Sequence, residues 1–315
     1  MNMLEPMPED MIKLDGSTSK IVRLPNEMNY DGTLRDVLDN LEVEIAKIGR
    51  SDSVTFDAPR IIRATVDYKI LHPSEETEQL VETAIKLALE IYRGSSKSKT
   101  KLREFRELVD LKHPQLLDAQ LRQKEDGVTW KAMQREKSIE TANELAEVGG
   151  RVLFIALGHG GVAAGMDVFN DYCSVAKENE GSEFYVVRFS TQKAGDDQPQ
   201  VTENEIRALR NKSLGKRIII FDEDIASGRT ISKANEYFSR MFSRSVKTVT
   251  NMTIREALGP ATLKKPGLVV STLEPGVHIN QDFDGLQEKY ITTLNLLKWK
   301  KENPAKQARK TVSVV

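Results

Sequence analysis

The sequence predicts an α/β fold in which a parallel sheet is flanked by helices and preceded by a mostly helical N-terminal region. Two observations carry this prediction. After Gly127, short continuous apolar runs alternate with helical segments, a pattern typical of strands that are buried on both faces of a parallel sheet. Before Gly127, the chain shows helix caps and helical periodicity instead. We therefore expect a helical region over 1–125, an α/β domain over 126–295 and a basic tail over 296–315.

The clearest helix of the N-terminal region is predicted to begin after Ser74. Ser74 is a suitable N-cap, and the two glutamates after it suit the positive end of the helix dipole. Apolar residues then recur on one face, namely Leu80, Ala84, Leu87 and Ile91. Gly94 is a natural stop. The apolar-rich segment Arg60–Leu71 instead suggests a strand, and Ser95–Thr100 suggests a linker before two shorter helices that His113–Pro114 separates.

Five apolar runs are predicted to be strands of the α/β domain. They are Val152–Leu157, Phe184–Phe189, Ile218–Phe221, Val246–Met252 and Leu268–Ser271. A helix from about Val128 to Glu147 is expected before the first run, ending at Gly149–Gly150. Since ligands of such sheets sit beyond the carboxyl ends of the strands, the loops that follow these runs are the expected binding site.

Composition excludes several classes of protein. The net charge is −1, and one cysteine, Cys173, allows no disulfide within the chain, which suggests a reducing compartment. No apolar run approaches the roughly 20 residues of a membrane span, and the N-terminus does not resemble a secretory signal. We therefore expect a cytoplasmic protein with no membrane partner. Basic stretches occur at Arg93–Lys124 and Lys298–Lys310; nucleic-acid binding is possible there, but solvated helix faces and tails are the favoured interpretation.

The segment after Ile218–Phe221 carries the most specific chemistry. Three acidic residues follow the strand, then the small-residue turn Ala226-Ser227-Gly228, and then a helix from about Thr230. Glycine lets backbone amides approach a ligand closely, and amides that open a helix bind phosphate well. The carboxylates would repel a phosphate unless they meet hydroxyl groups or a metal ion. The combination therefore suggests a phosphorylated sugar.

This order of residues resembles the phosphoribosyl pyrophosphate (PRPP) signature of type I phosphoribosyltransferases. The resemblance implies that Asp222 and Glu223 bind the ribose hydroxyls and act as the catalytic carboxylates. It also implies a phosphate loop made of Ala226, Ser227, Gly228, Arg229 and Thr230. Glu223 stands where aspartate is usual, Asp224 where an apolar residue is usual, and Ala226 where purine-type members carry an aspartate base.

Two further loops fit the same resemblance. His159-Gly160-Gly161 follows the first strand, at the family's pyrophosphate loop, with histidine where arginine or lysine is common. Arg188–Val201 corresponds to the flexible loop that closes over the site, and Arg188 and Lys193 are its candidate phosphate contacts.

The resemblance implies an enzyme that uses PRPP and Mg²⁺ to transfer a 5-phosphoribosyl group to a nucleobase or similar acceptor. Mg²⁺ would be held mainly through substrate and water, with Asp222 and Glu223 as the protein side of its site. The family often forms homodimers. One alternative is a non-catalytic PRPP or nucleotide-binding regulator that contacts a protein or nucleic acid. Another is a dinucleotide-dependent oxidoreductase, because Gly158, Gly160 and Ala163 also fit a dinucleotide fingerprint; however, the next strand carries Arg188 rather than the expected acid.

Overall fold

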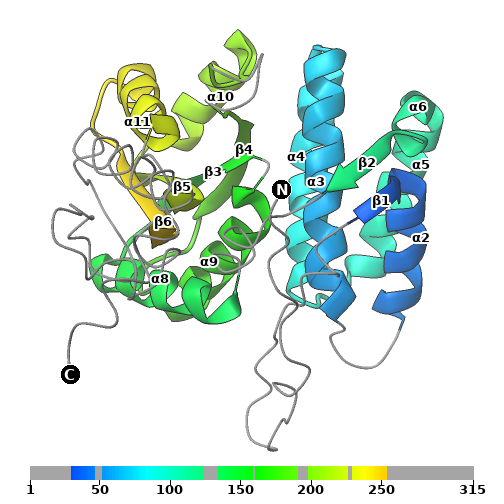
Figure 1. The fold of residues 1–315 in the computed structure, drawn as a ribbon, viewed down its shortest axis with the longest axis horizontal. Coiled ribbons are helices and arrows are strands. Elements are labelled where there is room, and N and C mark those ends of the chain that lie inside the picture. Colours follow the sequence, from blue (N-terminus) through cyan, green and yellow to red (C-terminus); the bar gives the residue numbers. More distant parts are fainter. Residues whose placement is uncertain are drawn as a thin grey trace, which may run out of the picture.

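The computed structural model describes residues 30–46, 52–123, 134–158, 160–190, 198–225 and 229–253. Figure 1 shows an α/β unit with a helical N-terminal region beside it. The N-terminal region contains, in chain order, β1 (Tyr30–Thr33), α2 (Leu34–Ile45), α3 (Asp52–Leu71), α4 (Glu75–Tyr92), α5 (Ser98–Lys112), α6 (Pro114–Leu117) and β2 (Gln120–Gln123). The α/β unit contains α8 (Arg135–Val148), β3 (Val152–Gly158), α9 (Gly161–Val175), β4 (Glu183–Arg188), α10 (Glu203–Lys212), β5 (Arg217–Ile225), α11 (Arg229–Phe242) and β6 (Lys247–Thr253).

Local sequence signals set several helix ends. The Ser74 hydroxyl accepts a hydrogen bond from the Thr77 N–H at 3.2 Å, so Ser74 caps α4 as predicted. Gly94 follows this helix with a φ of +66°, a left-handed conformation that favours glycine. The Thr202 hydroxyl caps α10 in the same way, by accepting from the Glu205 N–H.

The strand prediction for Arg60–Leu71 is wrong, because this segment forms most of α3. The helix packs against α2, α4 and α9 and also contacts β4, so side chains around much of its circumference are buried. Apolar residues spread through a short segment are typical of a buried strand, but a helix enclosed on several sides shows the same pattern. The expected linker Ser95–Thr100 is also shorter than predicted, since α5 already begins at Ser98.

The four strands of the main sheet are all parallel and lie in the order β4-β3-β5-β6. The chain passes from β3 to β4 on one side and then crosses to β5 on the other side of β3. This arrangement confirms the predicted parallel sheet and puts the point where strand order reverses between β3 and β5. The fifth predicted strand, Leu268–Ser271, and the first part of the helix expected from Val128 lie outside the described residues.

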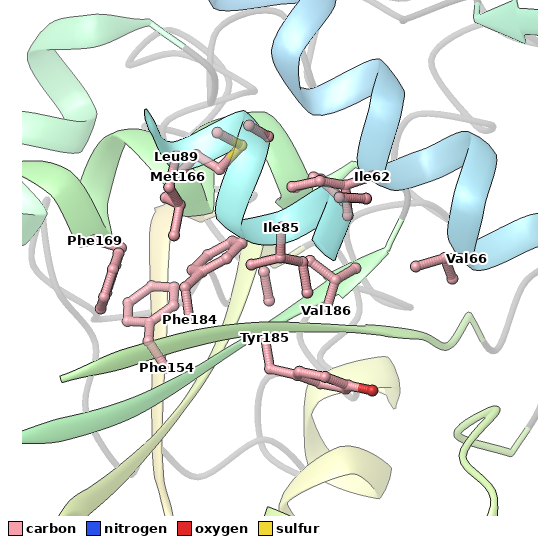
Figure 2. Close-up of a cluster of buried hydrophobic side chains, with 14 of the residues drawn as sticks. Ile62, Val66, Ile85, Leu89, Phe154, Met166, Phe169, Phe184, Tyr185 and Val186 are labelled. Carbon is pink, nitrogen blue, oxygen red and sulfur yellow. The ribbon is translucent and has the colours of Figure 1, made fainter. Parts of the chain in front are cut away.

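The helical region and the sheet share one hydrophobic core. Figure 2 shows Ile62 and Val66 of α3 and Ile85 and Leu89 of α4 beside the sheet residues Phe184 and Val186. A buried ion pair adds a polar contact, since Lys69 Nζ of α3 lies 2.7 Å from Glu205 Oε1 of α10. The N-terminal helices are thus packed onto the α/β unit and hold its β4 side. Within the described ranges, no helix has both the length and the apolarity required to cross a membrane.

Candidate functional site

The candidate site lies where strand order reverses, at the carboxyl ends of β3 and β5. Gly158 is the last residue of β3, and Gly160 lies immediately before α9. Asp222 and Glu223 lie near the end of β5, the strand directly beside β3. In open α/β sheets this reversal leaves a crevice between the two connecting loops, because the helices after the two strands cover opposite faces.

The acidic residues lie on β5 itself, and the prediction that they form a loop after Phe221 is wrong. The strand continues to Ile225 because β6 runs alongside it, with Asp222 in register with Thr250 and Asp224 with Met252. Successive side chains of a strand point to opposite faces. Asp222 and Glu223 therefore project to different sides of the sheet, with Asp222 half-buried and Glu223 only 8 % exposed.

Glu223 lies against the first turn of α9. A Cβ atom placed on Gly160 would come within 1.6 Å of Glu223 Oε1, and one on Gly161 within 3.5 Å of Glu223 Oε2. The carboxylate is therefore close to the N-terminal end of α9, where the helix dipole stabilises a negative charge. The fold thus brings the predicted pyrophosphate loop and one of the two predicted ribose-binding carboxylates into contact.

A magnesium ion at this site would be held only in small part by the protein. Asp222 and Glu223 both carry hard oxygen ligands, but they leave β5 on different faces, so one ion would take a ligand from only one of them. In the described part of the chain, no three or more histidine, cysteine, aspartate or glutamate side chains form a group that could hold a metal ion by themselves. Most ligands of a Mg²⁺ ion here would therefore have to come from substrate phosphates and water, which Mg²⁺ commonly retains.

Arg188 lies at the same edge of the sheet as the candidate site. It is the last residue of β4 and is in register with Gly158 of β3. Its Nη1 donates a hydrogen bond to Asp67 Oδ1 of α3 at 2.7 Å. The guanidinium is thus engaged with the N-terminal helices, and contacting a substrate phosphate would require it to leave Asp67 or to share its donors.

The remaining predicted site residues are only partly covered by the structure. Arg229 and Thr230 begin α11, and Thr230 is half-buried there. The other predicted contacts lie outside the described residues; they are His159, Lys193, Ala226, Ser227 and Gly228. The phosphate loop between β5 and α11 therefore stays a prediction.

A second group of polar residues around α3 was not predicted from the sequence. Arg60, Arg63 and Asp67 line a cleft of about 370 Å³ together with Tyr30 and Arg122. Their spacing of three and four residues places the first three on one face of a helix. The signal was present in the sequence, but the strand prediction for this segment put Arg60 on the opposite face from Arg63 and Asp67.

No known protein family has a model that matches this chain, and no curated protein or solved structure matches it either. A function for this chain therefore has to be inferred from its residues and their geometry.

Proposed function

We propose that this chain has a type I phosphoribosyltransferase-like fold and transfers a 5-phosphoribosyl group from PRPP to an acceptor, with Mg²⁺ bound. The observation that supports the proposal most strongly is the contact between Glu223 and Gly160 at the strand reversal. The resemblance assigns Glu223 to the ribose and Gly160 to the pyrophosphate, and these two parts of PRPP are joined at one carbon. If one PRPP molecule is to contact both residues, Glu223 and Gly160 must be neighbours, and they are.

Each residue would have a distinct role. The Glu223 carboxylate, beside Gly160, would accept hydrogen bonds from the ribose hydroxyls, which suit acceptor-only groups. Asp222 leaves β5 on the other face, so its side chain would have to turn around the end of the strand to reach the same ribose. The backbone amides that open α11, together with the Thr230 hydroxyl, would hold the 5-phosphate. The bond from the anomeric carbon to pyrophosphate breaks, the acceptor forms a new bond to that carbon, and the acceptor's proton passes to solvent. Bound Mg²⁺ would offset the charge of the departing pyrophosphate.

The position of Glu223 also sets a condition for binding. A carboxylate beside Gly160 and Gly161 repels a pyrophosphate that approaches the same helix end. The repulsion falls when a divalent cation lies between the two anions or when the Glu223 side chain moves toward the ribose. PRPP affinity should therefore depend on Mg²⁺.

The first test is a calorimetric titration of PRPP into the full chain, with and without Mg²⁺. We expect saturable binding that needs Mg²⁺ and that weakens at least about tenfold in Asp222→Asn, because one charged acceptor is lost. Asp110→Asn is the matched control: it makes the same change at an exposed position of α5 and should leave the affinity unchanged. Absence of PRPP binding by the unmodified protein would contradict the proposal.

A second measurement separates enzyme from regulator. Pyrophosphate release in the presence of a panel of nucleobases would support the transferase. PRPP binding without release for any acceptor would favour the non-catalytic regulator. Saturable binding of a nicotinamide dinucleotide in place of PRPP would favour the oxidoreductase.

A further inference from the structure

A cleft of about 370 Å³ lies between α3 and the antiparallel pair β1–β2. Figure 1 shows this pair of strands next to α3, in the N-terminal region. Pockets that bind small molecules have volumes of about 300–1,000 Å³, so the cleft has room for a small ligand. Its position on the N-terminal helices distinguishes it from the candidate site at the end of β5.

Arginine dominates the polar lining of this cleft. Arg60 and Arg63 come from adjacent turns of α3, and Arg122 comes from β2. Arg60 and Arg63 are only 6 % and 7 % exposed, whereas Arg122 is on the surface. A guanidinium in a poorly solvated position attracts an anion more strongly than one in water, because the local dielectric is lower.

Neighbouring groups fix Arg60 in place. Its Nη1 donates to the buried carboxylate Asp57 Oδ1 at 2.5 Å, and its guanidinium lies 4.2 Å from the centre of the Tyr30 ring. A side chain held from two sides loses little conformational freedom when a ligand arrives. The cleft is thus preorganised on its α3 side.

Arginines outnumber carboxylates among the described residues that line the cleft. Asp67 is the single carboxylate among the described residues that line the cleft, and Arg188 pairs with it at 2.7 Å. Arg122 lies 3.6 Å from Asp31. Arg60 pairs with Asp57, and Asp36 lies near Tyr30, so carboxylates around the cleft offset much of the arginine charge. The lining itself, with three arginines and one carboxylate among its described residues, favours an anionic ligand.

We propose that this cleft binds a small phosphate-bearing anion at a site separate from the β5 edge. Phosphate is the chemistry that fits best, because arginine donors from two elements approach one space and a tetrahedral phosphate accepts hydrogen bonds in several directions. The volume leaves room for an organic group on the phosphate. Since Asp67 also holds Arg188, the ligand would bind close to the residue that links α3 to the end of β4.

The test uses inorganic phosphate as the probe, titrated by calorimetry into the full chain in a phosphate-free buffer. We expect saturable binding that weakens about tenfold in Arg122→Gln, since a charged donor is lost at a surface position. Asp67→Asn removes the repelling carboxylate of the lining and should tighten binding by about threefold or more. A gain in affinity cannot be produced by misfolding. Arg103→Gln, at an exposed position of α5, is the control and should have no effect.

Absence of saturable phosphate binding, or affinities that are unchanged in both cleft variants, would overturn the proposal. If Thr230→Val weakens phosphate binding and Arg122→Gln does not, the phosphate lies at the start of α11, which also rejects the cleft. Conversely, phosphate binding that depends on Arg122 would support the cleft even if PRPP does not bind at all. The two proposals therefore fail independently.

Discussion

The carboxylate of Glu223 occupies the space that a side chain at residue 160 would need. A Cβ on Gly160 would lie 1.6 Å from Glu223 Oε1, far inside van der Waals contact. Glu223 comes from the end of β5 and Gly160 from the start of α9, so the contact joins the two loops that flank the strand reversal. Glycine at 160 is therefore required by a specific neighbour.

Gly160→Ala should destabilise the protein by about 1–3 kcal/mol, because either the Glu223 side chain or the start of α9 must move. The same substitution should have a much smaller effect in a Glu223→Ala background, where the space is open. Glu223→Gln keeps the size of the side chain and should give no relief. Urea unfolding of these variants measures each free energy. Equal effects of Gly160→Ala in the Glu223→Ala and Glu223→Gln backgrounds would show that the contact does not limit residue 160.

The buried pair Lys69–Glu205 should be sensitive to loss of one partner. Both side chains are 3 % exposed, and Lys69 also donates to the Gln200 carbonyl at 3.2 Å. Lys69→Met leaves the Glu205 charge buried with the Tyr185 hydroxyl as a remaining donor, so we expect a loss of about 3–5 kcal/mol in the free energy of unfolding. Glu205→Gln, added to Lys69→Met, should recover part of that loss.

An exposed pair provides the control for this prediction. Arg103 and Glu107 of α5 lie 3.8 Å apart, with both side chains 71 % exposed. Arg103→Gln should change the free energy of unfolding by less than about 1 kcal/mol, because water screens exposed charges. Similar losses at the buried and the exposed pair would show that burial does not set the strength of the Lys69 contact.

Tyr30 should make the protein less stable in alkaline solution. Burial, together with the nearby carboxylates of Asp57 and Asp36, raises the pKa of Tyr30 to about 12. The unfolded chain ionises this tyrosine near its ordinary pKa of 10.0, whereas the folded chain keeps it neutral. The contribution to stability is therefore complete below about pH 10 and is lost as the pH rises toward about 12.

Tyr30→Phe is the variant that isolates this effect. Urea unfolding at several alkaline pH values should show a shallower loss of stability in Tyr30→Phe than in the unmodified chain. Tyr68→Phe, which removes a different half-buried tyrosine in α3, controls for the general effect of losing one hydroxyl. If the free energy of unfolding falls equally with pH in the unmodified chain and in Tyr30→Phe, ionisation of Tyr30 does not contribute to the alkaline loss of stability.

Gly165 should tolerate no side chain where α9 crosses the sheet. A Cβ there would lie 2.9 Å from the Ala156 Cβ and 3.2 Å from a ring carbon of Phe221. Gly165→Ala should therefore destabilise the protein by about 1–3 kcal/mol despite the better helix propensity of alanine. Ala156→Gly should reduce that loss by removing the closest neighbour. Urea unfolding compares the variants, and an increase in stability on Gly165→Ala alone would refute the close packing.

Part of this structure could be predicted from short stretches of adjacent residues. The Ser74 cap, the stop at Gly94 and the apolar runs of the first four predicted strands all correspond to observed elements. They could be predicted because capping, left-handed glycine and strand burial depend on a few adjacent residues. The sequence also indicated which loops follow the strands, and hence the edge at which Asp222, Glu223 and Gly160 lie.

Long-range packing decided the rest. Arg60–Leu71 is a helix because α2, α4, α9 and the sheet enclose it, and those neighbours come from distant parts of the chain. β5 extends through Asp222 and Glu223 because β6 supplies its hydrogen-bonding partner. The contact of Glu223 with Gly160, and the convergence of arginines from α3 and β2, likewise depend on which elements become neighbours. The sequence by itself determined most of the elements and the residue types at their ends. Only the tertiary structure decided the helical state of Arg60–Leu71, the length of β5 and which of these ends meet, because non-local contacts are not encoded in any single segment.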